Sequence, residues 1–364
     1  NVVSNLDEFT ECIHHSVGEL TKRTGVRIKT VQLGVSGAII DSRLTTTTIP
    51  LIDKGNKVIT QHDIRKVDDN ARLLGAQMEE EVLHDLPQYY RIDDVNSALN
   101  PLGLYGRKLG VNSLMIVVNE NNISNITKAI HQAGYDVANI FLDSYAASEV
   151  VLNEEELKNG CVLIDLGAQY TTVLVFYDGV LQLLNGINIG ARHLTCGISQ
   201  EVDLPFDLAE EIKKSYAIVS GFDQHQDEEI LVKKDHGYKP IKRALIYQAI
   251  SSKIDLLVEF IGQTVGSCDF KNQMAGGVTL IGGGALLPGL IERISEDLDL
   301  PVTLAKMQLP LQKPLEHTAL FSSIVGLAHG GFKKTLRYSI SSNQYQHWTK
   351  SFKNRVKELY QEYF

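Results

Sequence analysis

Residues 163–172 read Leu-Ile-Asp-Leu-Gly-Ala-Gln-Tyr-Thr-Thr, with apolar runs on both sides. The pattern predicts a buried strand that ends near Asp165, a turn through Gly167, and a second strand from Thr171. An aspartate at such a turn can face a metal-bound phosphate. The glycine lets backbone N–H groups approach phosphate oxygens, and a threonine hydroxyl adds a donor. The alternative is a plain strand–turn–strand in which the aspartate only forms the turn.

Two later segments suit other parts of a nucleotide. Residues 279–290 read Thr-Leu-Ile-Gly-Gly-Gly-Ala-Leu-Leu-Pro-Gly-Leu. This predicts a strand that runs into Gly282, Gly283 and Gly284, where a flat or charged ligand could lie on bare backbone near a helix N-terminus. Glu210 and Lys213 share a helix face, where they could hold ribose hydroxyls and stack on adenine. Their plain alternative is a solvated ion pair, and a lone glycine-rich turn is weak evidence.

Outward from these segments, strands and helices alternate through the second half of the chain, which indicates an α/β fold. A capping box at Asn5 and Glu8 predicts a helix over residues 5–23, and alternation predicts a strand over 26–35. An α+β module interrupts the fold early. Its expected strands are 41–52, 82–92 and 111–118, and its expected helix is 60–74.

Charge and cysteine usage exclude several classes of protein. The 364 residues carry a net charge of −9, so the surface as a whole would repel nucleic acid. The four cysteines lie far apart, so neither a zinc site nor a disulfide framework is indicated. There is no signal peptide and no apolar run long enough to cross a bilayer.

The last thirty residues differ from the rest. Residues 333–364 carry seven Lys and Arg against two Glu. Bulky apolar residues recur there at helical spacing, which predicts an amphipathic helix in a membrane interface; the alternative is a helix packed on the body. The apolar positions are Trp348, Phe352, Val356, Leu359, Tyr360, Tyr363 and Phe364, and the basic ones are Lys350, Lys353, Arg355 and Lys357.

Taken together and in this order, the three nucleotide segments resemble those of actin-fold ATPases. Within that superfamily the chain resembles the FtsA family along essentially its whole length. Two stretches of the early module resemble FtsA sequences. They read Val-Leu-His-Asp-Leu-Pro-Gln-Tyr-Tyr-Arg-Ile-Asp over 82–93 and Asn-Pro-Leu-Gly-Leu-Tyr-Gly-Arg over 100–107. Further matches are residues 147–156, residues 190–195 and the triple glycine.

The resemblance implies an α/β, actin-like (ribonuclease H-like, duplicated) ATPase fold with a small α+β insertion. The implied subdomains are 1A (1–37 and 119–158), 1C (38–118), 2A (159–204 and 275–335), 2B (205–274) and a linker with the terminal helix (336–364). It also implies ATP with magnesium. The implied ligand residues are Asp165 (through water to the metal), Gly167, Thr171, Glu210, Lys213, Gly282, Gly283 and Gly284.

The role implied by the resemblance is that of a polymerising protein that anchors FtsZ filaments to the membrane. Its expected partners are the FtsZ C-terminal tail, further copies of itself and an anionic membrane surface, with no nucleic acid. Its expected place is the cytoplasmic face of the bacterial inner membrane at the division septum, as a peripheral protein.

The sequence departs from the FtsA pattern at three points. Gln169 occupies a position where the family has a glycine close to the phosphates. Thr172 occupies a position where the family has an acidic residue. The family's first phosphate hairpin is absent, and we expect it upstream of Asn1. Asp143 occupies the position of the acidic residue expected to orient water, where the family has Glu. Asp143 and Asp165 are the candidate catalytic residues. These departures predict ATP binding with weak or absent hydrolysis.

Other functions on this fold remain open from the sequence. A PilM-like scaffold of a pilus or secretion machine would share the phosphate and adenosine loops. A sugar kinase should show a catalytic Asp in a sugar cleft, and a chaperone should carry a peptide-binding domain; neither is visible. A shared fold does not assign a function.

Overall fold

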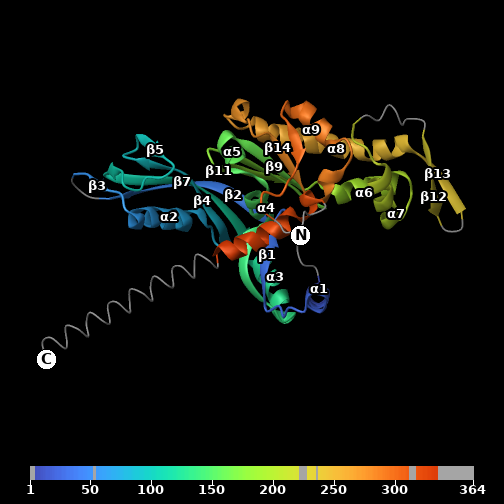
Figure 1. Cartoon of the computed structure of the whole chain (residues 1–364), viewed down its shortest axis with the longest axis horizontal. Helices are drawn as coiled ribbons and strands as arrows, with labels where there is room; N and C mark the ends of the chain where they lie inside the picture. Colours follow the sequence, from blue (N-terminus) through green and yellow to red (C-terminus); the bar gives the residue numbers. More distant parts are fainter. Residues whose placement is uncertain (1–4, 52–54, 221–227, 235–236, 311–316, 335–364) are drawn as a thin grey trace.

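The computed structural model describes residues 5–51, 55–220, 228–234, 237–310 and 317–334. In Figure 1 the molecule is elongated, with the inserted module at one end, a central five-stranded sheet, and the hairpin β12–β13 at the other end. A small lobe that contains α1 and α3 lies to one side of this long axis.

The first lobe pairs two parallel strands, β1 (Thr30–Val35) and β8 (Asp136–Leu142). Helix α1 (Leu6–Thr24) begins at Asn5, whose side chain accepts N–H groups of Asp7 and Glu8, and it ends at Gly25 with a φ of 68°. Helix α3 (Glu120–Gln132) packs on α1. The predicted helix 5–23 is confirmed. The predicted strand 26–35 is wrong at its start, because pairing begins only at Thr30.

The inserted module has an antiparallel sheet of its own in the order β2-β7-β4-β5. Helix α2 (Gln61–Gly75) starts in a capping box between Thr60 and Asp63. It buries Ile64, Val67 and Ala71 in the module's core. The strands are β2 (Ile40–Pro50), β3 (Lys57–Val58), β4 (Glu80–Ile92), β5 (Asn96–Ala98), β6 (Tyr105–Gly106) and β7 (Lys108–Asn119).

The second lobe is built on a sheet in the order β11-β10-β9-β14-β15. Its strands are β9 (Cys161–Leu166), β10 (Thr171–Tyr177), β11 (Val180–Ile187), β14 (Val278–Ile281) and β15 (Val302–Leu304). The dipeptide Asp178-Gly179 is typical of two-residue hairpin loops, and positive φ angles at both residues form the tight turn between β10 and β11. Helix α4 (Asp143–Val151) directly follows β8 of the first lobe. The helices after it are α5 (Glu154–Asn159), α6 (Ala191–Glu201), α7 (Phe206–Tyr216), α8 (Arg243–Gly266) and α9 (Leu290–Leu298). The hairpin β12 (Glu229–Lys234) and β13 (Gly237–Lys242) lies beside α8.

Helical residues 318–334 return from the second lobe to the first. Gly326 packs so closely on α4 that a Cβ atom there would lie 2.2 Å from the Ala146 carbonyl oxygen. Leu327 contacts Gly34 of β1, and Lys333 forms an ion pair with Glu149 at 3.1 Å. This helix therefore ties the two lobes together.

The predicted interfacial helix, with all eleven of its apolar and basic residues, lies outside the described residues. Among the helices that are described, none combines the length and the apolar character needed to span a bilayer.

Candidate functional site

Two carboxylates from different lobes form the centre of the site. Asp165 is the penultimate residue of β9, and Asp143 is the first residue of α4. Burial raises the pKa of Asp143 to about 6, although the Ser36 hydroxyl and the Ser144 N–H donate to its carboxylate. Burial, and then the charge of Asp143, raise the pKa of Asp165 to about 7. The two groups are therefore close enough for the charge of Asp143 to favour the protonated form of Asp165.

The turn after Asp165 is held by the start of α6. The carbonyl oxygens of Gly167 and Ala168 accept the N–H groups of Ala191 and Arg192, at 3.0 and 2.7 Å. Gly190 has no room for a side chain, since a Cβ atom there would lie 2.6 Å from the Gly167 oxygen. The turn is thus fixed by backbone contacts, which suits a loop whose N–H groups must be preorganised for an anion.

Thr171 has a structural partner in this structure. Its side chain is fully buried, and its hydroxyl donates to the Ile189 carbonyl oxygen at 2.7 Å. The hydroxyl therefore ties β10 to the segment that follows β11. The residues that are exposed in the turn are Ala168 and Gln169.

The triple-glycine loop lies directly beside Asp165, because Ile281 pairs with Asp165 across β14 and β9. A Cβ atom on Gly284 would lie 1.7 Å from Cδ2 of Leu166. Gly282 has a φ of 88° and donates its N–H to the Ala319 carbonyl oxygen at 2.9 Å. Gly283 differs from both, because it is exposed and a Cβ atom there would meet only Leu320, at 3.5 Å. Gly283 is therefore the glycine of the three whose backbone is open to a ligand.

Glu210 and Lys213 form an ion pair of 2.6 Å on α7. The Lys213 ammonium also donates to Thr195 Oγ1 at 2.9 Å and to the Ala191 carbonyl oxygen at 3.1 Å, and Lys213 is only 7% exposed. Although burial opposes it, hydrogen bonds from Lys213 and Thr195 hold the pKa of Glu210 below its ordinary range. The solvated-pair alternative does not describe Lys213, since this pair fixes α7 to α6, whose first residues hold the turn at Gly167.

The structure thus brings Asp165, Gly167 and the three glycines into one region and places Asp143 opposite them. Sequence reasoning missed Ser36, Ser144 and Gly190. Ser144 is fully buried, and within the described residues its hydroxyl has no hydrogen-bond partner. The signal that could have pointed to Ser36 is the segment Gly34-Val-Ser-Gly37, a glycine-flanked hydroxyl at the end of β1.

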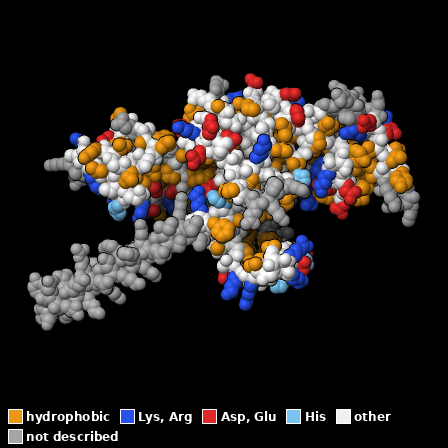
Figure 2. Space-filling view, viewed as in Figure 1, with side chains coloured by type: hydrophobic (Ala, Val, Ile, Leu, Met, Phe, Trp, Pro, Cys, Tyr) orange, Lys and Arg blue, Asp and Glu red, His pale blue; other side chains and the backbone are white. Residues whose placement is uncertain are grey.

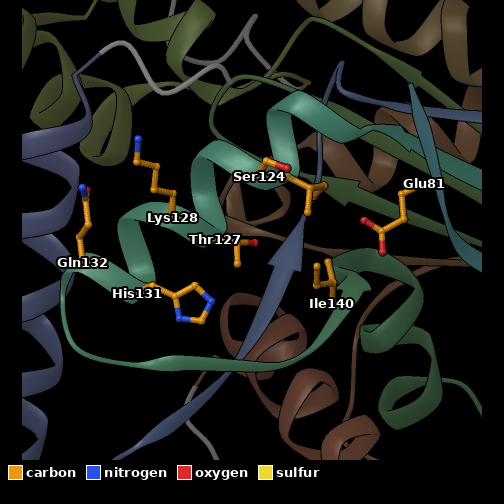
Figure 3. A pocket seen from close by; sticks show the side chains of 8 residues that line it. Glu81, Ser124, Thr127, Lys128, His131, Gln132 and Ile140 are labelled. Carbon is orange, nitrogen blue, oxygen red and sulfur yellow. The ribbon is translucent and has the colours of Figure 1, made fainter. Parts of the chain in front are cut away.

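A second hollow, of about 700 Å³, lies outside this region, between α3, β8 and β4 (Figure 3). Ser124, Thr127, Lys128 and His131 line it from one helix, with Ile140 and Glu81 across from them. It contains none of the predicted ligand residues. Within the described chain, no group of three or more His, Cys, Asp or Glu side chains could hold a metal ion.

Two family models match the chain. Residues 162–326 match "Cell division protein FtsA", and residues 37–117 match "SHS2 domain inserted in FTSA". Among curated relatives, FtsA of Borreliella burgdorferi is 26% identical over 85% of this chain and 75% of its own length. FtsA of Pseudomonas aeruginosa is 25% identical over 94% and 83%.

Solved structures agree on the fold. A PilM–PilN type IV pilus biogenesis complex aligns with a TM-score of 0.63 at 16% identity, covering 88% of this chain and 84% of that one. MreB 5 of Spiroplasma citri bound to AMPPNP aligns with a TM-score of 0.50 at 17% identity, covering 62% and 68%. Likeness at this level of identity shows the fold alone, and that fold is the actin-like α/β fold that the sequence predicts.

Proposed function

Because the chain belongs to the FtsA family of cell-division proteins, we propose that it binds ATP between its lobes and ties FtsZ filaments to the membrane. The place of action would be the cytoplasmic face of the bacterial inner membrane, at the division septum. The observation that carries the nucleotide part is the convergence of Asp165, the Gly167 turn and the exposed Gly283 backbone opposite Asp143.

The residues present fit a magnesium nucleotide. An ionised Asp165 would hold the cation through water, and the charge of a bound cation would favour the ionised carboxylates, against the burial that raises their pKa. The open backbone at Gly283 suits the base or ribose, and the N–H groups of the Gly167 turn suit phosphate oxygens. The Glu210 carboxylate would reach a ribose hydroxyl, and Lys213 would hold that carboxylate through its ion pair. Magnesium would neutralise phosphate charge; the chain's own groups bind and orient the nucleotide.

Hydrolysis would be weak or absent. Asp143 is shorter than glutamate and, with its raised pKa, is partly protonated near pH 6, where a water-orienting carboxylate must be ionised. Gln169 places a side chain where the family has a glycine. The proposed cycle therefore depends on binding and release of nucleotide more than on turnover.

Self-association and FtsZ binding would use opposite ends of the molecule. The inserted module exposes large apolar side chains, among them Leu73, Leu74 and Met78, the last 97% exposed, and these support a junction between copies. At the other end, β12 and β13 expose Leu231 and Tyr238, which support docking of a short FtsZ tail on residues 205–274. The acidic body argues against nucleic acid as a partner.

The test is co-flotation of FtsZ with anionic vesicles, with and without this protein and Mg-ATP. We expect FtsZ to float only when the full chain is present, and ATP to increase the amount. A Leu231→Glu, Tyr238→Glu variant should still float with the vesicles but leave FtsZ behind. Failure of the wild-type chain to bring FtsZ to the vesicles would reject the proposed anchoring role.

A further inference from the structure

A basic turn joins α1 to β1 at the tip of the small lobe. It contains Lys22, Arg23, Arg27 and Lys29, and all four are exposed. Gly25 adopts a φ of 68° there, so the chain reverses within this segment and brings the charges of its two arms together. In Figure 2, Lys and Arg side chains gather on this small lobe.

The charges of the turn are largely free of partners. Lys22 pairs with Glu19 at 2.9 Å, whereas Arg23, Arg27 and Lys29 form no ion pair in the described part of the chain. Val26 lies between them and is 61% exposed. A tip that combines unpaired cations with an exposed aliphatic side chain suits an anionic surface with an apolar interior more than it suits water.

The last described residues of the chain lie on the same lobe as the turn. Residues 318–334 cross β1 toward its N-terminal end, with Leu327 against Gly34 and Gly331 against Gln32. Lys29 precedes Gln32 by three residues, which is about 10 Å along a strand. The end of this helix is held over β8, because the Lys334 ammonium lies 4.5 Å from the centre of the Phe141 ring.

We propose that the basic turn, residues 22–29, is a second membrane contact that rests on anionic lipid headgroups, on the same lobe as the root of the tail. This rests on the proposed membrane role and adds an orientation to it. The rest of the body is acidic, so an anionic leaflet repels it and attracts this tip. The tail alone would leave the body free to rotate, whereas two contacts fix which side faces the leaflet.

The experiment measures binding of the full chain to vesicles of phosphatidylglycerol with phosphatidylcholine. Arg23→Gln, Arg27→Gln, Lys29→Gln should weaken binding by roughly a hundredfold, because each of the three cations near an anionic leaflet contributes about fivefold. The difference should fade at high salt and be absent on phosphatidylcholine alone. Val26→Glu should also weaken binding. The matched control, Lys66→Gln, Lys158→Gln, Lys253→Gln, makes the same charge change at exposed positions elsewhere.

The outcomes separate the two proposals. If the triple variant binds the anionic vesicles as tightly as the control variant while a tail variant is released, the basic turn is not a membrane contact and the anchoring role stands. If the triple variant instead loses only binding to polyglutamate, the turn faces an acidic protein and this inference is overturned. If the wild-type chain binds no anionic vesicles, both the anchoring role and the second contact fail.

Discussion

Gly282 and Asp165 are in such close contact that a Cβ atom on Gly282 would lie 2.7 Å from Oδ1 of the Asp165 carboxylate. The same atom would lie 2.5 Å from the Leu166 carbonyl oxygen. The glycine loop and the end of β9 are therefore one packed unit, and a change on either side of this contact moves the other. Gly283, one residue further on, is outside that contact and can be changed without disturbing it.

This difference predicts opposite behaviour for neighbouring glycines. Gly283→Val should lower ATP affinity by at least about tenfold, because the new side chain occupies the space above the loop, and should leave the melting temperature nearly unchanged. Gly282→Ala should destabilise the protein by about 1–3 kcal/mol, since it combines a positive φ with a backbone collision. A fluorescent-nucleotide titration measures the ATP affinity of each variant, and a thermal melt measures its stability. If Gly283→Val binds ATP with wild-type affinity, the nucleotide does not bind at this loop.

Local signals in the sequence predicted much of the fold. The Asn5 cap, the Asp178-Gly179 turn and the run into Gly282 each have a short-range physical cause, so they could be predicted without tertiary information. The actin-like assignment needed more, because it came from three such signals in a fixed order. Only the family resemblance turned that order into an architecture.

The detail of the site depends on contacts that a sequence does not display. Whether Thr171 faces a ligand or the interior depends on which side of β10 is covered, and the partner at Ile189 lies eighteen residues away. The role of Gly190 depends on α6 docking against the turn at Gly167. The three-residue spacing of Glu210 and Lys213 is typical of an exposed ion pair on a helix, so the sequence indicated that Lys213 lies on the surface. Lys213 is buried because α6 packs against it.

The carboxylate pair predicts a pH dependence with a definite sign. The pKa of Asp165 is raised in the folded protein, so the folded state binds more protons than the unfolded state between about pH 4 and pH 7. Without nucleotide, stability should therefore fall as pH rises through this window. Asp165→Asn should reduce this slope, leaving the part that comes from Asp143, and stabilise the nucleotide-free protein by about 1–3 kcal/mol at pH 8, with little gain at pH 4.

Mg-ATP should bind more tightly as pH rises through about 7, because the cation competes with protonation of Asp143 and Asp165. The same Asn substitution should make ATP binding insensitive to magnesium. Urea unfolding and nucleotide titration at several pH values measure the two effects. A stability that rises with pH in the wild type, or equal slopes in wild type and variant, would contradict the assignment of the proton to this pair.

Lys213 and Lys214 provide a matched comparison of a buried and an exposed cation. Lys213→Met removes an ammonium with three hydrogen-bond acceptors and leaves Glu210 with less compensation. We expect it to cost about 2–4 kcal/mol in urea unfolding and to weaken ATP binding through α6. Lys214 contacts the same carboxylate at 3.4 Å from a side chain that is 70% exposed, so Lys214→Met should cost less than about 0.5 kcal/mol. Equal effects would mean that Lys213 is a surface residue.

The tail supplies the last prediction. Trp348→Glu with Phe352→Glu places two charges in the expected apolar stripe, so the protein should leave anionic vesicles. Burial of such a stripe contributes about 25 cal/mol per Å² of apolar surface, several kcal/mol in total. The melting temperature should barely change if the tail lies on lipid, whereas a tail packed on the body should lose stability. Leu231→Glu with Leu256→Glu is the control, because these side chains are exposed on the outer lobe and their charges should leave vesicle binding intact. Retained binding in the tail variant, or a fall of many degrees in its melting temperature, would show that the tail is structural.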